Sequence, residues 1–268
     1  MSRSFLAPAC LAVLAACTND ALPPGTDAGP VDAVGVSVDA YSERPRHERY
    51  IRGDQDTRLV IELDVVAGTE PRAGVIDRLV ARLGTLLDKP AGIEVVMGSI
   101  PSRGADHVWT EAELFALGDE TFANDAPPGT IVMHAMWIDG HHERDTASGA
   151  ILAVAWAHTH IAVFENTIEA NCDGQPLLGE RLCETAQYGV WLHEVGHVLG
   201  LVDNGTPMVT PHVDEAHGRH DSNDGCLMYW AYESSAGLDS LATTLIGGGE
   251  LPDFDAACLA DIAAVRDR

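Results

Sequence analysis

Runs of apolar residues along the chain predict five strands. Positions 58–66, 92–97 and 130–137 are rich in β-branched and other apolar residues, as expected for strands. Two shorter apolar runs, at 151–156 and 160–164, lie close enough along the chain to pair with each other as a fourth and a fifth strand. We therefore expect one mixed, twisted sheet of five strands.

Apolar residues at helical spacing predict helices between and after these strands. The expected helices lie at 71–88, at 110–117, at about 184–199 and from Asp253 onward. Thr110 and Glu113 match a capping box, which satisfies free N–H groups at a helix start, and Gly200 suits a helix end. The stretch that follows, up to Gly249, is expected to be mostly irregular. The elements predict an α+β fold in the order β-α-β-α-β-β-β-α, then loops, then a final helix.

The first residues have the pattern of an export signal. Arg3 precedes an apolar run that is too short to span a bilayer, and the run ends in Leu14-Ala15-Ala16-Cys17. This ending resembles the bacterial lipobox, which implies a signal peptide over 1–16 and a lipidated Cys17 that anchors the protein to a membrane surface. The alternative is an ordinary signal peptide with an incidental cysteine.

Composition divides the remainder of the chain in two. Residues 17–50 are rich in Pro, Gly and Asp and show no hydrophobic period, which predicts a disordered tether behind the lipidated cysteine. We expect the folded domain to occupy 51–268, with an upper subdomain at 51–200 and a lower one at 201–268. The expected location is the bacterial cell envelope, either periplasmic or on the outer surface, and we expect a monomer.

The charge of the chain argues against a nucleic-acid partner. The 268 residues carry a formal net charge of −25, from 41 Asp and Glu against 16 Lys and Arg. Nucleic-acid binding needs clustered basic side chains, which the sequence lacks, so we expect no nucleic-acid partner. A hydrophobic content of 46% is enough for a real core under a solvated acidic surface.

The cysteines agree with an oxidising compartment. Cys10 lies in the signal and Cys17 at the anchor, and an even number remains: Cys172, Cys183, Cys226 and Cys258. Four cysteines allow three pairings, and the sequence does not settle which one forms. We favour Cys172–Cys183 and Cys226–Cys258, because the first pair closes a short loop containing Gly and Pro.

The stretch 193-HEVGHVLGLVD-203 carries the main chemical signal of the chain. On a helix, His193 and His197 lie one turn apart on one face, so both imidazoles can bind a single ion. Glu194 lies beside them and can act as a general base without binding the ion. Two ligands and a base on one helix are typical of zinc hydrolases.

A polar helix face with hydrogen-bonded histidines is the alternative interpretation. Apolar residues at 188–192 and 198–199 predict that this helix is buried on most sides. A buried Glu194 is costly unless a neighbouring charge compensates it, and a bound cation would do so. The context therefore favours the metal site.

Gly200 and Asp203 extend the motif beyond the helix. A glycine at this position allows a sharp turn, after which Asp203 can reach the ion, since carboxylates bind zinc at about 2.0–2.2 Å. The whole string resembles the metzincin signature HExxHxxGxxH/D, with aspartate in the last place as in the snapalysin-type variant. Downstream, Cys226-Leu-Met228-Tyr229 resembles the metzincin Met-turn, and the resemblance covers about residues 58–230.

The resemblance implies a zinc endopeptidase with a metzincin-like fold. In that fold a mixed five-stranded sheet with two helices stands over an irregular C-terminal subdomain that contains the Met-turn and a final helix. His193, His197 and Asp203 would hold Zn²⁺ and leave a fourth position for water, and Met228 would pack beneath the site. Residues 149–156 are similar to the edge strand along which metzincins bind their substrate peptide.

The third ligand is the point at which the sequence departs from the commonest pattern. Asp203 stands where most members carry a histidine, and the segment after it contains His212, His217 and His220. Any of these three could complete the site, with Asp203 then supporting His193 or His197 as a hydrogen-bond partner. Spacing favours Asp203.

Two functions follow from these observations. The first is peptide-bond hydrolysis by metal-activated water, with Glu194 as general base and a protein or peptide as substrate. The second is a surface lipoprotein whose zinc site is structural or vestigial and which serves as a binding module.

Overall fold

The computed structural model describes residues 44–147, 149–172 and 178–268. The predicted signal peptide (1–16), the lipidated Cys17 and most of the predicted tether lie outside these residues. One compact unit begins at Glu43 and runs to Arg268. Among the described residues, no helix has both the length and the apolar character needed to cross a membrane.

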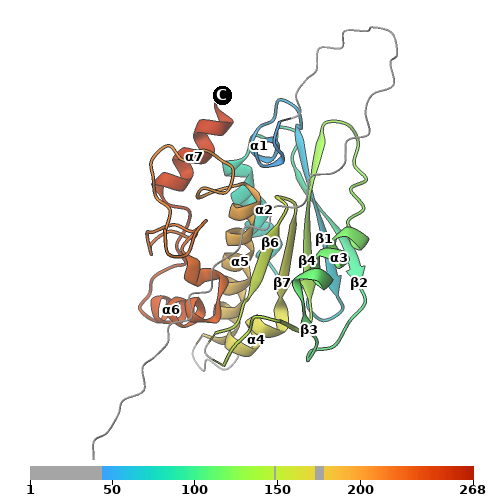
Figure 1. Ribbon diagram of the computed structural model, residues 1–268, viewed down its shortest axis with the longest axis vertical. Coiled ribbons are helices and arrows are strands. Elements are labelled where there is room, and N and C mark those ends of the chain that lie inside the picture. Colours follow the sequence, from blue (N-terminus) through green and yellow to red (C-terminus); the bar gives the residue numbers. More distant parts are fainter. Residues whose placement is uncertain (1–43, 148, 173–177) are drawn as a thin grey trace, which may run out of the picture. The chain divides into compact units, whose positions relative to one another are not determined.

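A five-stranded sheet forms the centre of this unit (Figure 1). Its strands, in spatial order, are β2 (Ile93–Ile100), β1 (Arg58–Val66), β4 (Thr130–Ile138), β7 (His160–Phe164) and β6 (Ala153–Trp156). The first four run parallel, and β6 pairs antiparallel with β7 at one edge. The predicted mixed sheet of five strands, with the last two paired, is confirmed.

Helices cover both faces of this sheet. They are α1 (Arg46–Ile51), α2 (Val75–Leu86), α3 (Glu111–Thr121), α4 (Glu165–Cys172), α5 (Gly179–Val198), α6 (Ser235–Ile246) and α7 (Ala256–Arg266), with a 3₁₀ turn η1 (Trp230–Glu233). Val108–Trp109 (β3) and His141–His142 (β5) form a separate two-stranded pair. In Figure 1, α5 lies along one face of the large sheet and α3 lies on the other.

Alternation along the strands decides which side chains enter the two cores. In β1, Leu59, Ile61 and Leu63 are fully buried and pack in the larger core with residues of α2 and α5. Met136 and Ile138 of β4 face the opposite side, where they join a smaller core beneath α3. Both faces of β4 are therefore covered, which explains its nearly continuous apolar sequence.

Helix α5 runs through the middle of the larger core. Nearly all of its residues from Leu182 to Val198 are buried, as the flanking apolar residues predicted. The helix ends where expected, because Gly200 takes a left-handed φ of 76°. A Cβ at this position would lie 2.9 Å from the backbone nitrogen of Thr206, so the turn requires glycine.

Several segments differ from the sequence-based expectations, among them α4 and the β3–β5 pair, which were not predicted. Helix α1 lies within the predicted tether, because Tyr50 and Ile51 are fully buried and the Tyr50 hydroxyl donates to the carbonyl of Val132 at 2.8 Å. Helix α6 lies in the stretch expected to be irregular. The last helix is capped by Asp255, whose carboxylate accepts from two backbone N–H groups, and not by Asp253.

One of the two favoured disulfides is present. Cys172 and Cys183 are bonded and connect the end of α4 to α5, as predicted. Cys226 and Cys258 are both free and buried, and their sulfur atoms lie 3.8 Å apart. The predicted Cys226–Cys258 bond is therefore not formed in this structure, although the chain does bring the two thiols together.

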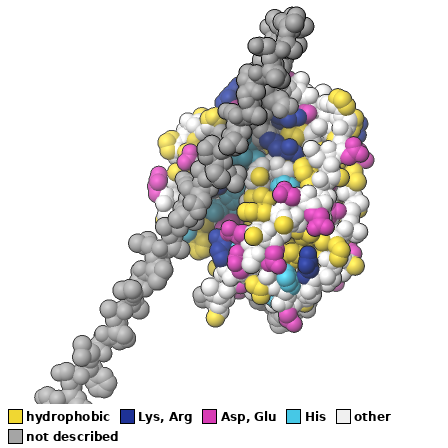
Figure 2. Space-filling model, turned by 45° about the vertical axis from the view of Figure 1, so that its right-hand side comes forward, with side chains coloured by type: hydrophobic (Ala, Val, Ile, Leu, Met, Phe, Trp, Pro, Cys, Tyr) yellow, Lys and Arg dark blue, Asp and Glu magenta, His cyan; other side chains and the backbone are white. Residues whose placement is uncertain are grey.

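The surface reflects the acidic composition. Figure 2 shows acidic side chains spread over the visible face of the unit, with basic side chains scattered among them. Several of the basic groups form ion pairs, including Arg49 with Asp56 and Arg72 with Glu169.

Candidate metal centre

Helix α5 presents the two predicted histidines side by side. The Nε2 atoms of His193 and His197 lie 3.1 Å apart, and the ring centroids are 4.9 Å apart. This proximity follows from the four-residue spacing on a regular helix. His193 is fully buried, whereas the side chain of His197 is 11% exposed. Of the two imidazoles, that of His197 is therefore the more accessible from outside the helix.

A third imidazole comes from the loop after α5. The ring of His220 lies 5.3 Å from that of His193 and 4.9 Å from that of His197. Backbone hydrogen bonds hold this part of the loop, since Asp214 N donates to His220 O at 2.7 Å and Asp221 N donates to Met228 O at 2.8 Å. His220 is therefore held in place on both sides along the chain.

Hydrogen bonds to carbonyl groups fix the tautomers of two of these rings. Nδ1 of His193 lies 2.7 Å from the carbonyl oxygen of Leu227, and Nδ1 of His220 lies 2.9 Å from that of Gly218. A carbonyl only accepts hydrogen bonds, so each Nδ1 carries the proton. In a neutral ring Nε2 then presents its lone pair, which is the form that binds a metal ion.

Burial keeps His193 and His197 neutral and leaves the neighbouring Glu194 carboxyl without hydrogen-bond partners among the described residues, whereas the Glu233 carboxylate raises the pKa of His220 in spite of its burial. Desolvation lowers the pKa of His193 to about 4 and lowers that of His197 well below its usual value, and other histidines lower both further. Burial also raises the pKa of Glu194, and the charge of Glu233 adds to the effect. Among the described residues, neither carboxyl oxygen of Glu194 has a hydrogen-bond partner. A cation beside it would stabilise its ionised form.

Glu233 is the fourth polar side chain at this position. Its Oε2 lies 3.9 Å from Nε2 of His193, 4.0 Å from Nε2 of His197 and 3.3 Å from Nε2 of His220. One donor atom from each of these four residues lies within 4.8 Å of the others, a spacing that suits a single metal ion. The donor set, three imidazoles and one carboxylate, fits zinc.

Asp203 is not a member of this group. The residue is exposed, and both Val202 and Asp203 have left-handed φ angles, of 53° and 57°. The residues after it close the end of α5, because the Asn204 side chain donates to His197 O and the Thr206 hydroxyl donates to Leu199 O. The turn after Gly200 thus caps the helix, and the Asp203 carboxylate remains on the surface.

The structure separates the three histidines that the sequence left as alternatives. His212 is buried elsewhere, between Asp221 Oδ2 at 2.8 Å and Asp261 Oδ2 at 3.0 Å. It belongs to a second group of close polar side chains: His212, Asp221, Asp255 and Cys258. His217 is partly exposed, and its ring stacks on Trp230 at 4.5 Å. Only His220, of these three, lies beside His193 and His197.

The turn that contains Met228 lies directly against α5. Tyr229 N donates to Cys226 O at 3.0 Å, which closes a tight turn, and Met228 is fully buried. A Cβ on Gly196 would clash with the sulfur of Met228, so the helix accepts this side chain only because residue 196 is glycine. Leu227, in the same turn, supplies the carbonyl that orients His193. The turn therefore packs against the helix that carries the histidines and orients His193 through the Leu227 carbonyl.

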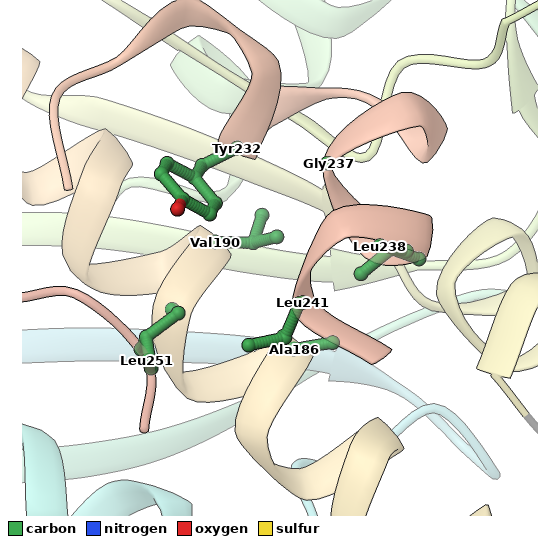
Figure 3. Close-up of a pocket in the computed structure, with 8 residues that line it drawn as sticks. Ala186, Val190, Tyr232, Gly237, Leu238, Leu241 and Leu251 are labelled. Carbon is green, nitrogen blue, oxygen red and sulfur yellow. The ribbon is translucent and has the colours of Figure 1, made fainter. Parts of the chain in front are cut away.

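A small apolar pocket lies along the same helix (Figure 3). Ala186 and Val190 of α5, Tyr232 of η1 and Leu238 and Leu241 of α6 line it, together with Leu251 and two glycines. Its lining contains none of the four metal-binding candidates. The pocket shows that α6 and η1 pack closely on the helix that carries His193.

Glu233 is the residue of this group that could not be predicted from the sequence. It lies in a 3₁₀ turn with no periodic pattern, and no motif includes it. His220 was found only as one of three candidates, because a loop has no fixed geometry that spacing could reveal. The helical residues His193, Glu194 and His197 were accessible to prediction because α-helix geometry fixes their relation.

Comparisons with known proteins find similarity only to solved structures, at low sequence identity. No protein-family model and no curated protein matches the sequence. Archaemetzincin from Methanopyrus kandleri is 14% identical over 79% of this chain and 97% of that chain, with a TM-score of 0.48. A zinc-dependent peptidase from Methanocorpusculum labreanum is 15% identical over 75% of this chain and 99% of that chain, with a TM-score of 0.46. At this level of similarity, the chemistry of the chain has to be argued from its own residues.

Proposed function

We propose that this protein is a zinc-dependent endopeptidase whose ion is held by His193, His197 and His220. The observation that carries the proposal is the convergence of three Nε2 atoms next to Glu194, a fully buried carboxyl group without a hydrogen-bond partner among the described residues. Imidazole nitrogens in the neutral form are the ligands that catalytic zinc sites commonly use. In this assignment His220 takes the place that spacing had suggested for Asp203.

The chemistry needs a Lewis acid and a base. Zinc, when bound, supplies the Lewis acid that polarises the scissile carbonyl and lowers the pKa of a water molecule. Glu194 takes the proton of the attacking water and passes it to the leaving amine nitrogen. Helix α5 carries Glu194 directly after His193 in sequence and buries it, which would restrict the movement of the base.

The proposed substrate is an extended peptide that adds to the sheet edge. Strand β6 is the edge strand and pairs with β7 on its inner side, and the side chains from Val154 to Trp156 are half-buried. An edge strand offers free backbone N–H and C=O groups to a peptide. The same edge lies next to α5, which carries the histidines.

Export and lipidation complete the proposal. Residues 1–16 would direct the chain out of the cytoplasm, and Cys17 would carry the lipid that attaches it to a membrane of the cell envelope. The disulfide between Cys172 and Cys183 supports a compartment in which such bonds persist.

A structural zinc site is the second candidate, and Glu233 is the observation that favours it. Structural zinc sites have four protein ligands, whereas catalytic sites keep one position for water. If Glu233 were a permanent fourth ligand, the protein would be a surface binding module without peptidase activity.

The test compares Glu194→Ala with wild type and with Glu180→Ala, a matched change at an exposed position on the same helix. All three proteins should hold one zinc ion, measured by elemental analysis. Glu194→Ala should lose casein cleavage by at least about 100-fold, the usual contribution of a general base. Undiminished cleavage by Glu194→Ala would rule out the mechanism, and zinc-loaded wild type without cleavage would favour the binding module.

A further inference from the structure

Glu233 differs from the three histidines in the way the chain holds it. His193 and His197 belong to a buried helix, and the side chains of all three histidines are at most 11% exposed. The Glu233 side chain is 35% exposed and lies in the short turn η1. A side chain of this kind can leave the group without unfolding the elements that carry the histidines.

The Glu233 carboxylate lies where it can form an ion pair with a protonated His220 or share a cation with the neutral ring. Its Oε2 is 3.3 Å from Nε2 of His220. Because Nδ1 of His220 faces the carbonyls of His217 and Gly218, Nε2 has no proton to donate in the neutral ring. In that neutral form both atoms present lone pairs at the same place, which is the arrangement of two ligands around one cation.

The backbone next to Glu233 occupies part of the sheet edge. Leu152 N donates to Glu233 O at 2.9 Å, and Ser235 N donates to Ala150 O at 2.9 Å. These two bonds form an antiparallel bridge between Ile151 and Ser234. Residues 150–152 lead directly into β6, the strand proposed to bind the peptide. The segment 233–235 therefore pairs with the chain in the way that a substrate peptide would.

We propose that Glu233 is a displaceable fourth ligand of the metal and that the segment 233–235 is an internal inhibitory contact. This inference rests on the proposed function. In the resting protein the Glu233 carboxylate holds the coordination position that catalysis needs for water, and the backbone of 233–235 holds edge hydrogen bonds at 150–152. A peptide that extends along β6 towards these residues competes for the same N–H and C=O groups.

Activation is then a ligand exchange. With the ion bound, the Glu233 carboxylate would move into solvent with its negative charge unchanged, and the position it leaves would be open to water. No oxidant or reductant is needed.

The test uses full-length protein with Glu233→Ala, Glu233→Gln and the control Glu215→Ala, which removes an exposed carboxylate from the loop before His220. Zinc affinity is measured by competition with a chromophoric chelator. Loss of a direct ligand should weaken zinc binding by at least about tenfold in both Glu233 variants, since even loss of a ligand's hydrogen-bond partner costs that much. Glu215→Ala should bind zinc as wild type does.

Acetohydroxamate binding to the cobalt-substituted proteins gives the second measurement, followed by the visible absorption bands of the metal. Wild type must displace Glu233 before the hydroxamate binds, so both Glu233 variants should bind it at least about tenfold more tightly. If Glu233→Ala fails to fold, Glu233→Gln answers the same question, because it preserves the size of the side chain and leaves the backbone bond from Leu152 N to the carbonyl of residue 233 in place.

The two proposals fail in different ways. Unchanged zinc and hydroxamate affinities in the Glu233 variants, beside a wild type that binds zinc and cleaves casein, would overturn the displaceable ligand alone. If the Glu233 variants bind zinc more weakly and the wild type binds no hydroxamate at all, Glu233 is a ligand that does not exchange. This result also overturns the proposal. A wild type that never retains zinc would end the proposed function itself.

Discussion

At the residue scale, the metal centre depends on how the backbone presents each donor. His220 is held by hydrogen bonds at its own carbonyl, at its Nδ1 and at the next residue. Asp203 lies in a left-handed turn whose neighbours cap α5, so its carboxylate has no path to the histidines without loss of the cap. Chemical suitability as a ligand is therefore less decisive than the path of the loop.

This difference predicts that substitution of His220 weakens zinc binding and that substitution of Asp203 does not. His220→Ala should lower zinc affinity by at least about tenfold, because it removes a direct ligand. Asp203→Ala should leave zinc affinity unchanged, and so should His217→Ala, which alters a neighbouring histidine of the same loop. The measurement is zinc content after dialysis against a competing chelator. Loss of zinc in Asp203→Ala with retention in His220→Ala would reverse the assignment.

Glu165 is a buried carboxyl group outside the metal centre. It is 4% exposed, and burial raises its pKa to about 9, with Glu169 adding to the shift. The side-chain amide of Gln187 donates to one of its oxygens at 2.6 Å, while the other oxygen has no hydrogen-bond partner among the described residues. The folded protein therefore keeps Glu165 protonated at neutral pH.

The raised pKa predicts a pH-dependent stability. In the unfolded chain this carboxyl ionises near its ordinary pKa of 4.5, so between that value and about 9 the folded state binds the extra proton. The free energy of unfolding must then fall as the pH rises through this window. Glu165→Gln should flatten that decline, measured by urea unfolding at several pH values between about 5 and 9. Parallel pH profiles for the two proteins would contradict the buried, protonated state.

The parts of the site that could be predicted are those that helix geometry determines. His193, Glu194 and His197 needed only the assumption of a helix. His220 and Glu233 reach the same point through loops whose course depends on contacts such as Asp221 N to Met228 O, which leave no periodic trace in the sequence. Their place could be established only from the folded chain.

At the element scale, α5 is the part on which the site depends most directly. Its residue Gly196 faces Met228 and Phe254, and a Cβ there would lie 3.1 Å from the Phe254 ring and closer still to the Met228 sulfur. The exposed Gly84 in α2 has nothing within 4 Å of an added Cβ. The two glycines therefore separate the effect of helix propensity from the effect of close packing.

The two glycine-to-alanine substitutions should change the free energy of unfolding in opposite directions. Gly84→Ala should stabilise the protein by about 0.5–1 kcal/mol, because alanine loses less backbone entropy on helix formation. Gly196→Ala should destabilise it by about 1–3 kcal/mol, the usual cost of overpacking, in spite of the same gain in propensity. Urea unfolding measures both. A stabilising Gly196→Ala would show that Met228 moves aside at little cost.

Elements with strong periodicity were predictable, and those held by tertiary contacts were not. The β-branched and apolar residues of β1 and the continuous apolar run of β4 identified two strands correctly. Helix α6 contains Ser, Thr and Gly residues that favour irregular structure, and it forms because Leu238, Leu241 and Leu245 pack into the larger core. Tertiary packing there outweighs local preference.

At the scale of the whole molecule, the excess of acidic groups opposes compaction. The net charge of −25 is carried mainly by side chains that remain on the surface, as Figure 2 shows for one face. Like charges at this density repel one another more strongly in the folded state, where they are closer together, than in the unfolded chain. Salt screens such repulsion over a Debye length of about 10 Å at 0.1 M.

We therefore expect the melting temperature to rise with salt. Raising NaCl from about 10 mM to about 150 mM should increase the Tm by a few degrees at constant pH, because the repulsion is screened. Differential scanning calorimetry at fixed metal content measures the change. A Tm that falls with added salt would mean that the surface ion pairs contribute more than the general repulsion does.

The donors of the metal centre come from three segments that are distant along the chain: α5, the loop that carries His220, and η1. An ion bound by all of them would connect the C-terminal third of the protein to the helix that crosses its core, much as a cross-link does. Metal loading would then be part of the folding of this third. In surroundings poor in zinc, the protein would have a complete sheet but less firmly attached C-terminal segments, and proteases would remove these segments first.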